Sequence, residues 1–219
     1  MNPRLLQLVS PALPVGAYSY SQGLESAIES GTVRDAASAR RWIGDVLELS
    51  IANLEAPVLL RLVRAWRGGD VAAAARWNGE FVASREAAEL RAETLQMGYS
   101  LRRLLLELEV PGAHALEAFD ELAYPPVFAF AAAAWNVAER DALAAYLFAW
   151  IENQGLAAVK TVPLGQTDGQ RILLALGDRI PACVDRAIAL GDDELASFAP
   201  GLAIACARHE TQYSRIYRS

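Results

Sequence analysis

The 219-residue sequence has few of the residue types that build metal and redox centres. It contains two cysteines, Cys183 and Cys206, without CxxC spacing, and two histidines, His114 and His209. These four residues do not have the spacing of a zinc site, so we expect no cofactor and two buried, reduced thiols. Lysine is scarcer still: Lys160 is the only one among 20 basic residues.

Long apolar runs and excess positive charge are also missing. No apolar stretch approaches the roughly 18 residues of a membrane span, and prolines interrupt the N-terminal MNPRLLQLVSPALPVG, unlike a signal peptide. The net charge is −6, the wrong sign for a general binder of nucleic acid or anionic membranes. We therefore expect a soluble, cytoplasmic protein with neither nucleic-acid nor membrane partners.

Apolar residues recur with helical spacing along nearly the whole chain, and no convincing period-two strand occurs. This pattern predicts an all-α fold of about ten helical segments in a single domain, residues 1–219, without linker or repeat. The Ala-rich stretch PVFAFAAAAW predicts a buried central helix, because small side chains let neighbouring backbones approach closely.

Capping residues and prolines predict where several helices begin. Asn2 and Asp35 are expected to cap helices, and Pro57 is expected in the first turn of a separate helix. Two capping boxes are predicted, at Ser19 with Gln22 and at Thr167 with Gln170. A long helix is expected from Ser84 to about Glu109, and a last one from about Pro200.

No catalytic constellation is present, and we expect no enzyme. The sequence lacks both the GxxxxGK[ST] and the GxGxxG phosphate-binding motifs. His114 follows a Pro–Gly break and is expected to be exposed at a helix start. His209 lies in the polar stretch ARHETQYSR, which predicts a surface or interface position. The carboxylates Glu86 and Glu89 fall at a helix start, where the macrodipole favours anions.

Two loops contain residues that helix formation does not explain. Residues 10–25 place Tyr18 and Tyr20 after Pro14 in an apolar loop, and such aromatic residues with a polar tip are typical of interfaces. Residues 160–170, KTVPLGQTDGQ, form a donor-rich segment suited to a partner. Its candidate contact residues are Lys160, Gln166, Thr167, Gln170 and the adjacent Arg171.

The C-terminal stretch RHETQYSRIYRS is basic and aromatic, although the whole chain is acidic. Tyr and Arg are common in binding hot spots, so we predict a tail that docks to an acidic groove. We assign residues 1–18 and 209–219 as docking segments. The tail's candidate contact residues are His209, Tyr213, Arg215, Tyr217 and Arg218.

These stretches resemble, in the same order, the signatures of the UreF family of urease accessory proteins. The matching strings are LLQLVSPALPVGAYSYSQGLE, KTVPLGQTDGQRILLAL and FAPGLAIACARHETQYSRIYRS, and SREAAELRAETLQMG resembles the family's long helix. The resemblance covers essentially the whole chain. Two departures occur: residues 87–88, where Thr or Arg is expected, and Thr161, where an apolar residue is commoner.

The resemblance implies an all-helical homodimer that acts as a scaffold. Family members bind UreD (also called UreH) and recruit the GTPase UreG, and the assembly delivers nickel to apo-urease. They are thought to modulate the GTPase cycle, and a tunnel has been proposed to carry nickel in transit. By this resemblance the tail helps to order the UreD complex and supports UreG recruitment. The Lys160 loop faces UreG, and the N-terminal loop packs near the tail.

Three alternatives remain open from the residues. The GQTDGQ loop could belong to a nucleotide hydrolase. Arg171, Arg215 or Arg218 could act on a GTPase in trans as an arginine finger. Cys206 and His209, spaced i, i+3 on one helical face, could contribute to a nickel-storage site, although two ligands fall short of a closed shell.

Overall fold

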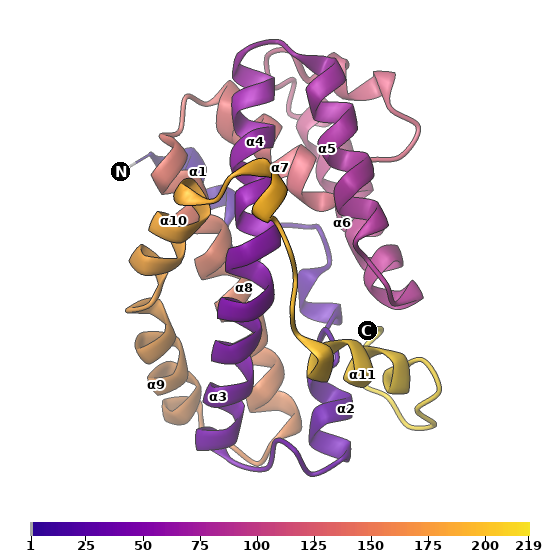
Figure 1. Ribbon diagram of the computed structural model, residues 1–219, viewed down its shortest axis with the longest axis vertical. Coiled ribbons are helices and arrows are strands. Elements are labelled where there is room, and N and C mark those ends of the chain that lie inside the picture. Colours follow the sequence, from indigo (N-terminus) through magenta and orange to yellow (C-terminus); the bar gives the residue numbers. More distant parts are fainter. Residues whose placement is uncertain (1) are drawn as a thin grey trace.

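The computed structural model describes residues 2–219, and all regular structure within them is helical (Figure 1). The α-helices are α1 (Pro3–Leu8), α2 (Leu24–Glu29), α3 (Ala36–Val46), α4 (Ala56–Arg67), α5 (Val71–Ala83), α6 (Ala88–Glu107), α7 (Tyr124–Ala134), α8 (Glu139–Thr161), α9 (Gln166–Gly177), α10 (Ile180–Ala189) and α11 (Pro200–His209). The predicted all-α fold in one compact domain is confirmed. Within residues 2–219, no helix combines the length and apolarity that a membrane crossing requires.

A single long helix crosses the molecule, because α3 and α4 are joined by a π-helical segment, Leu47–Glu55 (Figure 1). Pro57 lies in the first turn of α4, as predicted, but the helix is not separate from the segment before it. Proline has no N–H to donate to the preceding turn, which would normally break a helix. Here the Asn53 carbonyl accepts from the Ala196 N–H at 3.3 Å, and the Leu49 carbonyl accepts from the Phe198 N–H at 3.0 Å. The π-helical turns thus direct carbonyl groups toward a distant segment, which satisfies them.

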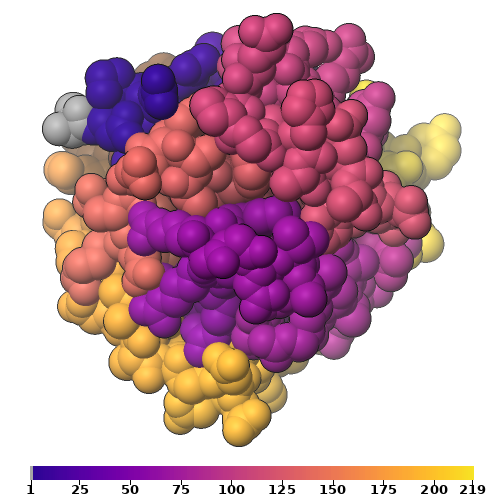
Figure 2. All heavy atoms as spheres, turned by 90° about the horizontal axis from the view of Figure 1, so that it is seen from above, coloured from indigo at the N-terminus to yellow at the C-terminus, as the bar shows by residue number. Residues whose placement is uncertain are grey.

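The Ala-rich helix α7 lies in the core, as predicted, with all residues from Pro125 to Ala132 buried. It packs against α4 and α6. Close approach to α6 depends on Gly98, where an added Cβ would lie 2.1 Å from the Leu122 carbonyl oxygen. Seen from above, the end of the bundle that lies at the top of Figure 1 is covered by the α4–α5 turn and residues of about 105–140 (Figure 2).

Some predicted helix starts are confirmed. The Asn2 side chain accepts from the Arg4 N–H, and the Asp35 carboxylate accepts from the Ser38 N–H. The last helix begins at Pro200, as expected. These starts depend only on residues within the first helical turn.

Three other predicted starts are wrong. Helices α2 and α9 follow Gly23 and Gly165 and have no side-chain cap, so neither predicted capping box forms. The side chain of Gln22 is used in the interior instead, as described below. Ser84 ends α5, where its hydroxyl bonds the Phe81 carbonyl, and α6 begins only at Ala88.

Candidate functional site

The C-terminal tail, residues 210–219, folds back over the N-terminal loop rather than extending away from the domain (Figure 1). The Ser21 N–H donates to the Ser219 carbonyl at 2.8 Å, and the Arg218 N–H donates to the Ser19 carbonyl at 2.9 Å. The resemblance implied that the loop packs near the tail, and the structure shows this contact. Within the tail, Tyr217 is buried, whereas Tyr213 is fully exposed.

His209 ends α11 and is completely buried between two carboxylates, so the predicted surface or interface position is wrong within this chain. Its Nδ1 lies 2.6 Å from Glu89 Oε2, and its Nε2 lies 3.2 Å from Glu25 Oε2. Arg215 Nη1 donates to the other oxygen of Glu89 at 2.5 Å. We call these four residues, Glu25, Glu89, His209 and Arg215, the tail clamp.

Glu25 is the member of the tail clamp that holds the tail backbone. Its Oε1 accepts from the Ile216 N–H at 2.7 Å, and its Oε2 accepts from the Tyr217 N–H at 3.0 Å. These two N–H groups follow each other in a segment without a helical ladder, so a carboxylate supplies the acceptors that secondary structure does not. Glu25 itself is held in α2, and the tail therefore follows the position of that helix.

A second polar contact continues from the tail into the interior through Glu93. Its carboxylate accepts from the Ser219 hydroxyl at 2.8 Å and from Gln22 Nε2 at 2.7 Å. Gln22 Oε1 in turn accepts from the Trp150 indole at 2.7 Å. Burial raises the pKa of Glu93 to about 7, and the hydrogen bonds from Gln22 and Ser219 only partly oppose this rise.

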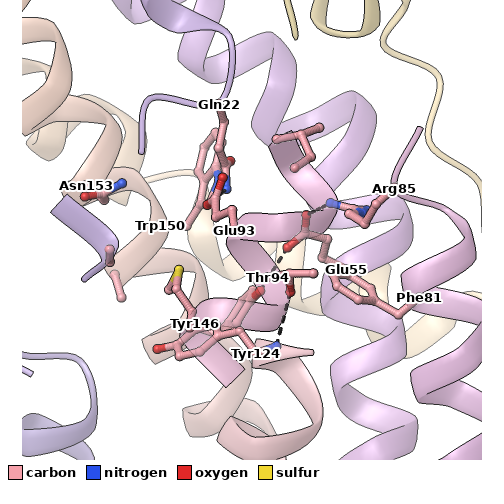
Figure 3. A pocket seen from close by; sticks show the side chains of 14 residues that line it. Gln22, Glu55, Phe81, Arg85, Glu93, Thr94, Tyr124, Tyr146, Trp150 and Asn153 are labelled. Atoms are coloured by element: carbon pink, nitrogen blue, oxygen red, sulfur yellow. Dashed lines mark hydrogen bonds and ion pairs between the residues drawn. The ribbon is translucent and has the colours of Figure 1, made fainter. Parts of the chain in front are cut away.

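Glu93 and Gln22 also line an interior cavity of about 80 Å³ (Figure 3). On its wall, Arg85 Nη1 pairs with Glu55 Oε1 at 2.6 Å, and the Tyr146 hydroxyl donates to Glu55 Oε2 at 2.9 Å. Arg85 also lines an outer groove of about 300 Å³, next to Phe198. The cavity therefore has a mostly apolar lining that includes the Glu55–Arg85 pair and Glu93, and it is adjacent to the surface on one side.

Two of the predicted contact residues pack together at the surface, and a third is bonded through its backbone to the neighbouring loop residue. The Lys160 Nζ lies 5.9 Å from the ring centroid of Tyr18, whose side chain is 62% exposed. Arg218 is exposed, and its backbone N–H donates to the carbonyl of Ser19, the residue that follows Tyr18. Burial raises the pKa of Tyr20, and the nearby Arg218 guanidinium only partly offsets this rise. We call Tyr18, Lys160 and Arg218 the Tyr18 surface.

The remaining predicted contact residues divide into exposed and buried ones. Pro14 is exposed in the N-terminal loop, and Gln166, Thr167, Gln170 and Arg171 are exposed at the start of α9. Tyr20, His209 and Tyr217 are buried and hold the tail to the domain in this conformation. A partner-binding role for any of these residues stays a prediction.

The other expectations for His and Cys side chains have mixed outcomes. Both cysteines are buried and unpaired, as predicted, and His114 is exposed. Burial raises the pKa of Cys206 to about 12, which disfavours the thiolate that binds metal. Both ring nitrogens of His209 face carboxylates. Among residues 2–219, no three His, Cys, Asp or Glu side chains are arranged to hold a metal ion.

Sequence reasoning missed the acidic residues that organise the tail. Glu25, Glu89 and Glu93 lie on helices, where acids near a helix start are ordinary. One local signal was available for Glu93. It precedes Thr94 and Met97 on the buried face of α6, and an acid on such a face requires polar partners.

Comparison with known proteins gives a consistent result. A model of the family described as UreF matches residues 33–177, more than half of the chain. Three curated relatives, each named urease accessory protein UreF, align with 99% of this chain. They come from Azoarcus sp. (strain BH72), Methylobacillus flagellatus and Dechloromonas aromatica, with identities of 60%, 55% and 54%. The alignments cover 94%, 96% and 96% of these relatives.

Proposed function

Because this chain belongs to the UreF family of urease accessory proteins, we propose that it is a non-catalytic scaffold for urease maturation. In this proposal it binds UreD (UreH), recruits the GTPase UreG and supports the delivery of nickel to apo-urease. Nickel is cargo in transit and not a resident cofactor. The protein acts as a cytoplasmic homodimer, as the family resemblance implies.

The Tyr18 surface is the observation that supports a docking role. It places the Lys160 cation over the exposed Tyr18 ring, with Arg218 bonded through its backbone to the residue after Tyr18, on a chain whose net charge is −6. Exposed charges contribute little stability by themselves, so their grouping beside an aromatic residue is better suited to binding. A partner that matches this surface presents carboxylates around an apolar contact for the Tyr18 ring.

Point substitutions test this docking role better than truncation does. Deleting residues 209–219 would leave Glu25 and Glu93 buried without their tail partners, and recruitment would then fail for structural reasons. Lys160→Ala removes an exposed charge, and Arg218→Ala removes an exposed charge that also lies near the Tyr20 hydroxyl. The control is Arg103→Ala, which removes another exposed cation, paired with Glu107 on α6.

We expect the Lys160→Ala/Arg218→Ala pair to reduce co-purification of UreG with the UreD-bound chain by tenfold or more. The melting temperature of the double variant should stay unchanged. The yield of the complex formed by the Arg103→Ala control should also stay unchanged. Undiminished recruitment by the double variant would refute the role of this surface. Mass measurement of the purified chain, alone and mixed with UreD and UreG, tests the homodimer and the assembly independently.

Activation of a GTPase through an arginine is a second candidate function, favoured by one observation. Of the three arginines considered, Arg171 and Arg215 form ion pairs with Asp168 and Glu89. Arg218 has no carboxylate in ion-pair contact among residues 2–219 and is exposed, so it is the arginine most available to a phosphoryl group in trans. Arg218→Lys should then lower GTP turnover of the assembled complex while the complex still forms. Equal turnover would leave docking as the only role.

A further inference from the structure

We propose that the tail clamp is proton-dependent: with a proton at both ring-nitrogen contacts of His209 it holds residues 210–219 against the domain, and loss of one proton loosens the tail. The inference goes beyond the proposed scaffold role. It depends only on contacts within this chain, and its test needs no partner.

Hydrogen-bond accounting at His209 carries the first step. Each ring nitrogen faces a carboxylate oxygen, of Glu89 at 2.6 Å and of Glu25 at 3.2 Å. A neutral imidazole has one N–H and one lone pair, so it can donate to only one of them. The other contact needs a second proton, on the nitrogen or on the carboxylate. The bound tail therefore requires two protons, one in each of the two ring-nitrogen contacts of His209.

The charges around His209 carry the second step. With both protons in place, the two carboxylates are balanced by the imidazolium and the Arg215 guanidinium. Removing one proton leaves a net negative charge and an unmatched lone pair around a side chain that has no solvent exposure. A buried, uncompensated charge is strongly unfavourable. The tail is the part that can yield, because it has no helical ladder of its own.

Connection to the tail backbone carries the third step. The Glu25 carboxylate that contacts His209 also accepts the N–H groups of Ile216 and Tyr217. Arg215, which contacts Glu89, is itself a tail residue. Any movement that relieves repulsion between His209 and these carboxylates therefore weakens three tail contacts at once.

Other titratable groups surround the clamp and must be separated from it. On α6, Glu93 bonds Ser219 of the tail, and burial raises its pKa to about 7. On α11, Cys206 stays a neutral thiol, since burial raises its pKa to about 12. The adjacent charged residues Arg208 and Glu210 are exposed, and Glu210 Oε1 accepts the Ala88 N–H. Glu93 is therefore the group whose titration must be removed in a control.

The test is hydrogen exchange of residues 210–219 in the full chain, measured at several pH values from about 6 to about 9. Wild type and variant are compared at the same pH, so the chemical dependence of exchange on pH cancels. We expect His209→Gln to open the tail at least tenfold more than wild type at the lowest pH. This ratio should shrink toward one as pH rises and wild type loses its proton, by up to tenfold per pH unit.

Two matched variants complete the experiment. His114→Gln removes the only other histidine, which is 90% exposed, and should behave as wild type. Glu93→Gln removes the neighbouring titration and should keep the pH dependence that His209 causes. If His209→Gln fails to fold by circular dichroism, Glu89→Gln replaces it, because an amide can donate to neutral His209 and should flatten the pH response. A pH-independent ratio, or an equal loss in His114→Gln, would overturn the proposal.

Discussion

Glu93 provides a quantitative prediction, because it is an acid buried on α6 with a pKa raised to about 7. Glu93→Gln replaces it with a neutral side chain of similar shape, which resembles the protonated acid. The substitution should leave the contacts with Ser219 and Gln22 similar to those of the protonated wild type. It should also abolish the change in proton binding at residue 93 that accompanies unfolding.

The magnitude follows from the pKa difference between folded and unfolded chain. The pKa of Glu93 rises by about 2.5, from the ordinary value of 4.5 to about 7. This difference corresponds to about 3 kcal/mol of unfolding free energy. A raised pKa means that the folded state binds more protons than the unfolded state between these values. The free energy of unfolding therefore falls as pH rises from about 4.5 through about 7. Glu93→Gln should gain about 2 to 3 kcal/mol over wild type between pH 5 and about pH 8.

Urea unfolding followed by tryptophan fluorescence at several pH values measures this difference. Glu29→Gln is the matched control, because Glu29 is exposed on α2 and its replacement should leave the pH profile of wild type unchanged. A constant difference between Glu93→Gln and wild type from pH 5 to about pH 8 would refute the assignment of a buried, largely protonated Glu93.

Three further predictions concern the core. Arg85→Met should cost about 3 to 5 kcal/mol in urea unfolding because it leaves the buried Glu55 carboxylate unpaired, and adding Glu55→Gln should restore more than half. Gly98→Ala should destabilise by about 3 kcal/mol because its Cβ meets backbone, whereas Gly79→Ala in open space should stabilise by about 0.5 to 1 kcal/mol in the same assay. Cys206 should react with a thiol reagent at least 100-fold more slowly in the native than in the unfolded chain, as absorbance at pH 8 would show, and comparable rates would contradict its burial.

The tail clamp and the Tyr18 surface are parts of one arrangement. The clamp holds the tail against the domain, and the Arg218 N–H bonds the carbonyl of Ser19, the residue after the exposed Tyr18. Loosening the clamp would therefore change the surface on which we propose that partners dock. The two proposals fail independently, because one is measured without a partner and the other at fixed pH.

The sequence by itself determined the helical fold and much of its order along the chain. Helical spacing, the caps at Asn2 and Asp35 and the buried Ala-rich helix α7 all depend on residues a few positions apart. The three signatures also located the segments that meet at the Tyr18 surface. These features could be predicted because their physical causes are local.

Only the tertiary structure decided how buried polar groups are paired. His209 contacts Glu25 across 184 positions, and Gln22 contacts Glu93 across 71. The helix continues through Pro57 because residues 196–198 supply donors to the π-helical segment. In each case the local sequence shows one polar group or one helix breaker. Its partner lies far away in the sequence, and the two meet only when folding buries both away from water.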